Sequence, residues 1–273
     1  SAASDVYKRQ LYSVIAGHDP RDSTSAHREQ IDYTSFLRED VNGIKIGVPK
    51  EFFGEGTSPA VKKLVWNAIY KLEELSAEYR ECSLPTLEYA LAAYYIIAMS
   101  EASSNLARYD GLRYGYSEDI SNIDWFTYSS RVRRNGFGPE VRRRIILGTY
   151  ALSSGYYNRY YLKALKIRTL IRRDFERIFK DFDVLVAPTM PTPPFGLGEK
   201  IEDPLELYMC DIDTVPANLA GLPSISIPCG FTGSNLPVGM QITAPTFRED
   251  LLFRVAYTYE RNTEYVKKRP RVN

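Results

Sequence analysis

The chain has 273 residues, 44% of them hydrophobic, which is enough to bury one large core or two modest ones. Its 35 Lys and Arg residues nearly balance 34 Asp and Glu residues, and a formal net charge of +1 argues against extensive direct RNA binding. Three cysteines without CxxC spacing, with only His18 and His27 to supplement them, disfavour both a structural zinc site and a disulfide scaffold.

The organisation of the chain is expected to be simple. No apolar run approaches the roughly 20 residues that cross a bilayer, and the N-terminus lacks the basic-then-apolar layout of a signal peptide, so we expect no membrane contact and a cytoplasmic location. Residues 1–10 differ in character from the residues after them and are interpreted as a non-native remnant. We assign 11–266 to a single domain and 267–273 to a basic tail.

The first half predicts a strand followed by helices. Residues 44–48 alternate as a short strand that ends at Pro49, and 59–78 predict an amphipathic helix. Residues 84–108 predict a long helix whose centre, 90–99, is apolar on nearly every face and should be mostly buried. The glycine-punctuated, aromatic stretch 111–138 predicts an irregular excursion.

The second half continues the α/β pattern. Residues 139–181 predict helix, interrupted near 153–155, and 183–187 predict a buried strand that the prolines of 188–194 end. Residues 214–221 predict a short helix with Thr214 as N-cap. Two further strands at 224–227 and 238–242, joined by a turn near 233–235, precede a final helix at 251–265.

The arginine triplet at 142–144 contains one candidate binding residue. A solvated helix face is the simpler interpretation of such a triplet. However, Arg144 shares its face with the small residues Gly148, Ala151 and Gly155, at which another group can approach the backbone closely. A guanidinium there would bind a carboxylate in a fork geometry that lysine cannot reproduce. We therefore expect Arg144 to point into a site.

Asp211 and Asp213 precede the short helix, and either could simply favour its dipole. If one of them binds a ligand, an α-ammonium group is the natural partner. An arginine and an aspartate across a pocket would then hold an amino acid by both of its charges.

Other reactive residue types are weaker candidates. Ser153 and Ser154 lie beside Gly155 but within a helical pattern, and no lysine or histidine is placed to activate them. His18 and His27 lie in a polar loop region that favours solvation over catalysis. Cys210 has no evident neighbour that would stabilise a thiolate.

Several segments together resemble the amidase-signature family, and within it the A subunits of the glutamyl-tRNA(Gln)/aspartyl-tRNA(Asn) amidotransferases. The segments that carry the resemblance are 15–25, 45–54, 94–98, 101–111, 143–150 and 218–223. The resemblance implies an α/β fold in which helices flank a mixed central sheet, truncated at the N-terminus.

The resemblance also implies a site and partners. Arg144 and Asp211 match the family's residues for the glutamine α-carboxylate and α-amino group, and Tyr95 matches a tyrosine of the same pocket. The family's Ser–cis-Ser–Lys triad, which releases ammonia from glutamine, should precede residue 11. No Gly-Gly-Ser-Ser-Gly-Gly-type loop occurs in these 273 residues, so we expect no catalytic residue in this chain. Asp213 and Met99 depart from the family pattern.

The family works as a complex of three subunits. Ammonia passes to a B subunit that binds the mischarged tRNA and uses ATP and Mg, and a small C subunit braces the assembly. This chain is therefore expected to bind no cofactor or metal itself. Two alternatives stay open: a stand-alone amidase that acts on another amide, and a non-catalytic scaffold whose helices only dock partners.

Overall fold

The computed structural model describes residues 5–28, 31–36, 38–119, 121–199 and 204–268, and it divides into two compact units. Unit 1 comprises Ser1–Glu88 and Ile171–Asn273, and unit 2 comprises Tyr89–Leu170. Helix α6 runs through the boundary between them, because it extends from Tyr161 to Ile178. The assignment of 11–266 to one domain stays a prediction.

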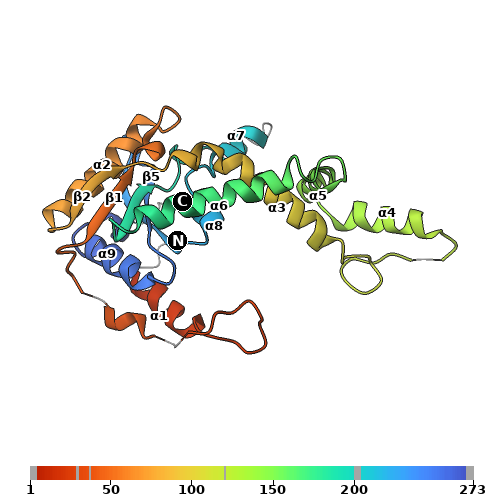
Figure 1. The fold of residues 1–273 in the computed structure, drawn as a ribbon, viewed down its shortest axis with the longest axis horizontal. Coiled ribbons are helices and arrows are strands. Elements are labelled where there is room, and N and C mark those ends of the chain that lie inside the picture. Colours follow the sequence, from red (N-terminus) through yellow and green to blue (C-terminus); the bar gives the residue numbers. More distant parts are fainter. Residues whose placement is uncertain (1–4, 29–30, 37, 120, 200–203, 269–273) are drawn as a thin grey trace. The chain divides into compact units, whose positions relative to one another are not determined.

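Unit 1 is a mixed five-stranded sheet with helices around it (Figure 1). Its helical elements are α1 (Asp5–Ile15), η1 (Tyr33–Phe36), η2 (Lys50–Phe53), α2 (Pro59–Glu74), η3 (Pro85–Tyr89) up to Glu88, the last part of α6, α7 (Pro204–Met209), α8 (Val215–Ala220), α9 (Glu249–Arg261) and η4 (Tyr265–Lys267). Its strands are β1 (Lys45–Pro49), β2 (Glu78–Cys82), β3 (Val184–Pro188), β4 (Ser224–Phe231) and β5 (Pro237–Thr243). The strand order is β2-β1-β3-β5-β4.

The sheet mixes both pairing directions, as expected. Strand β1 pairs in parallel with β2 and β3, whereas β5 pairs antiparallel with β3 and β4. Alternate residues of the strands enter one core together with the apolar stripes of α2 and α9, since successive strand side chains point to opposite faces. Ile46, Val186 and Met240 are fully buried members of this core.

The polar edge strand β2 was missed because its residues, Glu-Tyr-Arg-Glu-Cys, carry no apolar alternation. The helix predicted over 59–78 ends at Glu74 instead, and Ser76 adopts a positive φ of 75° before β2 begins. Pairing with β1 therefore decides the conformation of this segment, which is a tertiary effect that local sequence does not record.

Unit 2 consists of helices: α3 (Ala90–Leu106), α4 (Trp125–Gly136), α5 (Pro139–Leu152) and the first part of α6. The predicted break after 152 is confirmed. The expectation that 111–138 is wholly irregular is wrong, because α4 lies within it. The Asp124 carboxylate caps α4 by accepting hydrogen bonds from the Thr127 N–H at 3.0 Å and the Thr127 hydroxyl at 2.6 Å.

The chain ends and the shorter helices differ in detail from the predictions. Helix α1 begins at Asp5, within the part assigned to a non-native remnant, and that interpretation stays untested. The Thr214 hydroxyl does not cap α8, since it donates to the Asp211 carbonyl at 3.1 Å. Gly221 ends α8 in the left-handed conformation, which glycine adopts without strain. Most of the expected basic tail lies outside the described residues.

Candidate functional site

Arg144 lies one turn into α5, and a contact with Glu140 orients its side chain. Gly138 precedes the helix and Pro139 occupies its first turn, which places Glu140 near the positive end of the helix dipole. The Glu140 carboxylate accepts a hydrogen bond from Arg144 Nε at 2.9 Å and also pairs with Arg143 Nη1 at 3.1 Å. One carboxylate therefore orients two of the three consecutive arginines, and Arg144 is half-buried while Arg143 is exposed.

The row of small residues on α5 is filled by α3. A Cβ atom added at Gly148 would lie 2.6 Å from the Met99 carbonyl carbon and 2.7 Å from Ser103 Cβ. The Ser103 and Thr149 hydroxyls are 2.8 Å apart beside this contact. We expected a group to approach the backbone here. That group is the α3 backbone rather than a ligand, and Gly155, which lies beyond the end of α5, has open space around it.

Tyr95 lies close to the same helix crossing. It is half-buried on α3, and its ring meets the Tyr94 ring edge-on at a centroid distance of 5.1 Å. Tyr95 precedes Met99 by four residues, and Arg144 precedes Gly148 by four, so each lies about 6 Å along its helix from the contact. The structure thus brings Tyr95 and Arg144 onto two packed helices within unit 2.

Asp211 belongs to unit 1 and lies immediately before α8. Its backbone carbonyl accepts hydrogen bonds from the Thr214 and Val215 N–H groups, both at 3.0 Å, and the residue is exposed. Because the two units are described separately, a pocket that combines Asp211 with Arg144 and Tyr95 stays a prediction.

The sequence could not say how Asp213, the second candidate aspartate, differs from Asp211. Asp213 is only 3% exposed, and burial raises the pKa of its carboxyl to about 7. Within the described part of the chain, Oδ2 has no hydrogen-bond partner. Gln241 donates its side-chain N–H to the Asp213 backbone carbonyl at 3.1 Å. This hydrogen bond holds the loop backbone and does not involve the Asp213 carboxyl group. Asp211 is therefore the better placed of the two to meet a ligand.

Ser153, the first residue of the serine pair, lies directly after α5 and ends the helix. Ser153 donates its hydroxyl proton to the Tyr150 carbonyl at 2.8 Å, and its backbone N–H donates to the same oxygen at 3.2 Å. This arrangement agrees with the expectation that Ser153 is structural.

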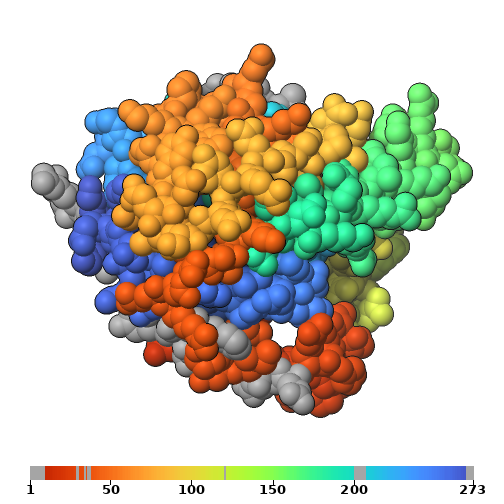
Figure 2. All heavy atoms as spheres, turned by 60° about the vertical axis from the view of Figure 1, so that its left-hand side comes forward, coloured from red at the N-terminus to blue at the C-terminus, as the bar shows by residue number. Residues whose placement is uncertain are grey.

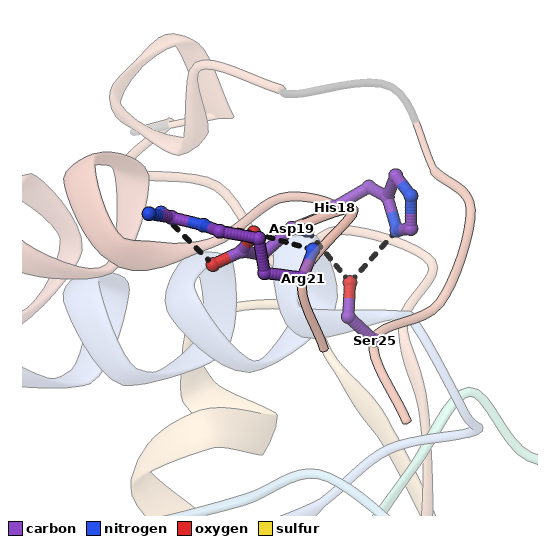
Figure 3. Close-up of polar contacts among 4 residues, drawn as sticks. All are labelled: His18, Asp19, Arg21 and Ser25. Carbon is purple, nitrogen blue, oxygen red and sulfur yellow. Dashed lines mark hydrogen bonds and ion pairs between the residues drawn. The ribbon is translucent and has the colours of Figure 1, made fainter. Parts of the chain in front are cut away.

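The loop after α1 holds His18 in a hydrogen-bonded turn (Figure 3). His18 Nδ1 is 2.8 Å from Ser25 Oγ, which also accepts the Asp19 N–H at 2.8 Å. The Asp19 carboxylate pairs with Arg21 rather than orienting the imidazole. The His27 ring packs against His18 at a centroid distance of 3.8 Å. Among the described residues no carboxylate orients the His18 ring, so this histidine and serine close a loop and do not form a triad.

The three cysteines are not joined to one another. None of them forms a disulfide, and burial raises the pKa of the Cys82 and Cys229 thiols to about 12. Across the described ranges, no group of three His, Cys, Asp or Glu residues is placed to hold a metal ion. No helix in that part of the chain is long and apolar enough to cross a membrane.

Comparison with known sequences links the geometry to a family. A family model described as Amidase matches residues 3–253. The chain is 59% identical over 260 residues to the A subunit of the glutamyl-tRNA(Gln) amidotransferase of Methanosarcina barkeri, and the match covers 95% of this chain and 54% of that protein. It is 56% identical over 264 residues to the protein of the same name from Halothermothrix orenii, with 96% and 54% covered.

Comparison with solved structures gives the same picture. The crystal structure of the A subunit of glutamyl-tRNA(Gln) amidotransferase from Thermotoga maritima matches with a TM-score of 0.75 and 37% identity, over 96% of this chain and 52% of that one. A bacterial aryl acylamidase of the amidase-signature enzymes shares the fold, with a TM-score of 0.74 and 22% identity. The chain spans about half the length of the relatives it matches.

Proposed function

This chain belongs to the amidase family, and from that premise we propose that it is the C-terminal part of the glutamine-hydrolysing A subunit of a glutamyl-tRNA(Gln) amidotransferase. The match confirms the amidase-signature resemblance and the mixed-sheet fold class drawn from the sequence. The observation that carries the proposal is the 59% identity, over 95% of this chain, to a protein with that name.

In the proposed reaction the whole subunit hydrolyses the glutamine side-chain amide and releases ammonia. A Ser–cis-Ser–Lys triad in another part of the protein performs the hydrolysis, so this chain alone is inactive. The B and C partner subunits complete a heterotrimer in the cytoplasm, in which the B subunit uses ATP and Mg to activate the mischarged Glu-tRNA(Gln) or Asp-tRNA(Asn). The role of this chain is to bind and orient glutamine.

The geometry of unit 2 supports the binding role of Arg144. Glu140 takes the Nε edge of the guanidinium, which fixes the plane of the group before substrate arrives. A planar, oriented guanidinium suits the α-carboxylate of an amino acid, and Tyr95 on the packed neighbouring helix provides a polar aromatic wall.

The state of the two aspartates supports assigning the α-ammonium group to Asp211. A counter-ion for an ammonium must be ionised and accessible. Asp213 is buried, and its pKa is raised to about 7, whereas Asp211 is exposed at the surface of unit 1. Together, Arg144 and Asp211 would select a ligand that carries both α-charges, which distinguishes glutamine from simple amides.

The test uses the full-length protein that contains this chain, assembled with its partner subunits. We expect Arg144→Lys to lower kcat/KM for glutamine roughly 10- to 100-fold, since hydrogen bonds to charged groups contribute about 1.5–3 kcal/mol. The readout is glutamate release at several glutamine concentrations.

The matched control is Arg143→Lys, which alters the adjacent residue that shares the Glu140 carboxylate. It should leave glutamine hydrolysis near the unaltered level. Equal activity in both variants would remove the binding role of Arg144 and favour a scaffold. Hydrolysis of simple amides in preference to glutamine would favour a stand-alone amidase.

A further inference from the structure

The balanced charge of the whole chain conceals one strongly basic segment. Between Pro139 and Leu170 there are seven Lys and Arg residues and one acidic residue, Glu140, an excess of six positive charges. The rest of the chain carries 28 Lys and Arg against 33 Asp and Glu, an excess of five negative charges. The net charge of +1, from which we expected no extensive RNA contact, is therefore the sum of two unlike parts.

Four of the seven cations of this segment take part in no ion pair among the described residues. Glu140 is shared by Arg143 and Arg144. No ion pair within the described ranges involves Arg142, Arg159, Lys163 or Lys166, and the last three of these are exposed. The charges of Arg159, Lys163 and Lys166 are thus accessible to solvent. In the space-filling view, the green atoms of residues around 150–170 lie at the surface (Figure 2).

Two basic residues, Lys163 and Lys166, share one side of α6, and Arg159 lies in the turn just before it. The chain turns helically before α6 begins, because the Tyr160 N–H donates to the Tyr156 carbonyl at 2.9 Å. Tyr156, Arg159 and Lys163 follow at i, i+3 and i+7, and Lys166 lies one turn beyond Lys163. Ala164 is buried, and it lies on the opposite side of the helix from Lys166. The cations therefore form a stripe about two turns long.

A cluster of tyrosine rings borders this stripe. The ring centroids of Tyr150 and Tyr156 are 4.5 Å apart, those of Tyr156 and Tyr160 are 5.7 Å apart, and those of Tyr150 and Tyr160 are 6.1 Å apart. Tyr150 is half exposed. Aromatic faces beside Lys and Arg provide both stacking surfaces and phosphate contacts, which is the combination that RNA-binding surfaces use.

We propose that this basic tyrosine surface, formed by Tyr150, Tyr156, Arg159, Tyr160, Lys163 and Lys166, binds the phosphate backbone of the tRNA substrate. The partner is RNA rather than protein because lysine is depleted at the cores of protein interfaces, whereas unpaired lysines are the usual contacts of phosphates. The proposal rests on the proposed function, which supplies the tRNA. Under this proposal the tRNA contacts this chain in addition to the contact expected through the B subunit.

The test measures how tRNA binding depends on salt in the full assembled complex. Each lost phosphate contact reduces the slope of log K against log salt by about 0.7–0.9. We expect Lys163→Gln with Lys166→Gln to flatten that slope by about 1.5 and to weaken the binding of a labelled tRNA transcript about tenfold at low salt. Lys163→Arg with Lys166→Arg keeps both charges and should retain the original slope.

The matched control removes two positive charges from another surface. Lys62 and Lys63 lie on α2 of unit 1, and changing both to glutamine should leave the slope unchanged. If this control and the α6 variant lost tRNA affinity and salt slope equally, the effect would come from net charge alone and the proposal would be overturned. Unchanged tRNA binding together with loss of the B or C subunit would also overturn it, and would assign the surface to a protein partner.

Measuring glutamine hydrolysis without tRNA distinguishes a failure of this proposal from a failure of the proposed function. The α6 variant should hydrolyse glutamine at the unaltered rate, because Lys163 and Lys166 are not among the residues assigned to the glutamine site. If the unaltered complex neither hydrolyses glutamine nor binds tRNA, both proposals fail. If it does both and the α6 variant matches it in slope and affinity, only the RNA surface is refuted.

Discussion

Substituting Gly148 by alanine is expected to destabilise unit 2 by about 3 kcal/mol or more. The added Cβ would lie 2.6 Å from the Met99 carbonyl carbon, and that atom belongs to the α3 backbone, so no side-chain rotation relieves the clash. Helices α3 and α5 would have to separate, and the 2.8 Å contact between Ser103 and Thr149 would be lost. Urea unfolding and amide exchange of both helices measure the effect.

The matched control is Gly155→Ala, because Gly155 lies in the same predicted row of small residues. A Cβ atom added there meets nothing within 4 Å, and its φ is not in the left-handed region. We expect a change within about 0.5 kcal/mol. If Gly148→Ala were as well tolerated as Gly155→Ala, the close packing of α3 on α5 would be refuted.

The sequence predicted the elements whose signals are local. The apolar stripe of α2, the alternation in β1 and β5, and the break after Leu152 follow from periodicity and from glycine and proline, and the structure has all of them. Strand β2 could not be found in this way, because its polar residues pair with β1 only after the chain has folded. Helix α4 carried a usable signal in the Asp124 and Thr127 pair, which predicts an N-cap.

The candidate site was predictable only in part. Helical spacing placed Arg144 on the same side as Gly148, but it could not say that α3 fills the space beside the glycine. The choice between Asp211 and Asp213 came from a family resemblance, since two acidic residues two positions apart look alike in sequence. Asp211 is exposed, whereas Asp213 is only 3% exposed, and this difference arises from the tertiary structure.

The buried carboxyl of Asp213 predicts that the chain loses stability as pH rises. Its pKa is about 7 in the folded state and about 3.9 in an unfolded chain, so the folded state binds more protons between these values. The stabilising effect of the protonated form is fully present below about pH 4 and is lost as the pH rises through about 7. About three pKa units correspond to roughly 4 kcal/mol at about 1.36 kcal/mol per unit.

We expect Asp213→Asn to remove most of this dependence, because an amide has nearly the shape of the protonated carboxyl group and does not ionise. At about pH 8 the variant should be a few kcal/mol more stable than the unaltered chain, and near about pH 4 the two should converge. Urea unfolding from about pH 4 to about pH 9 measures this difference. Asp181→Asn removes an exposed carboxylate and should shift the curve little. Parallel curves for Asp213→Asn and the unaltered chain would show that Asp213 is ionised in the folded protein, and the carboxylate would then need a partner that the observed contacts do not provide.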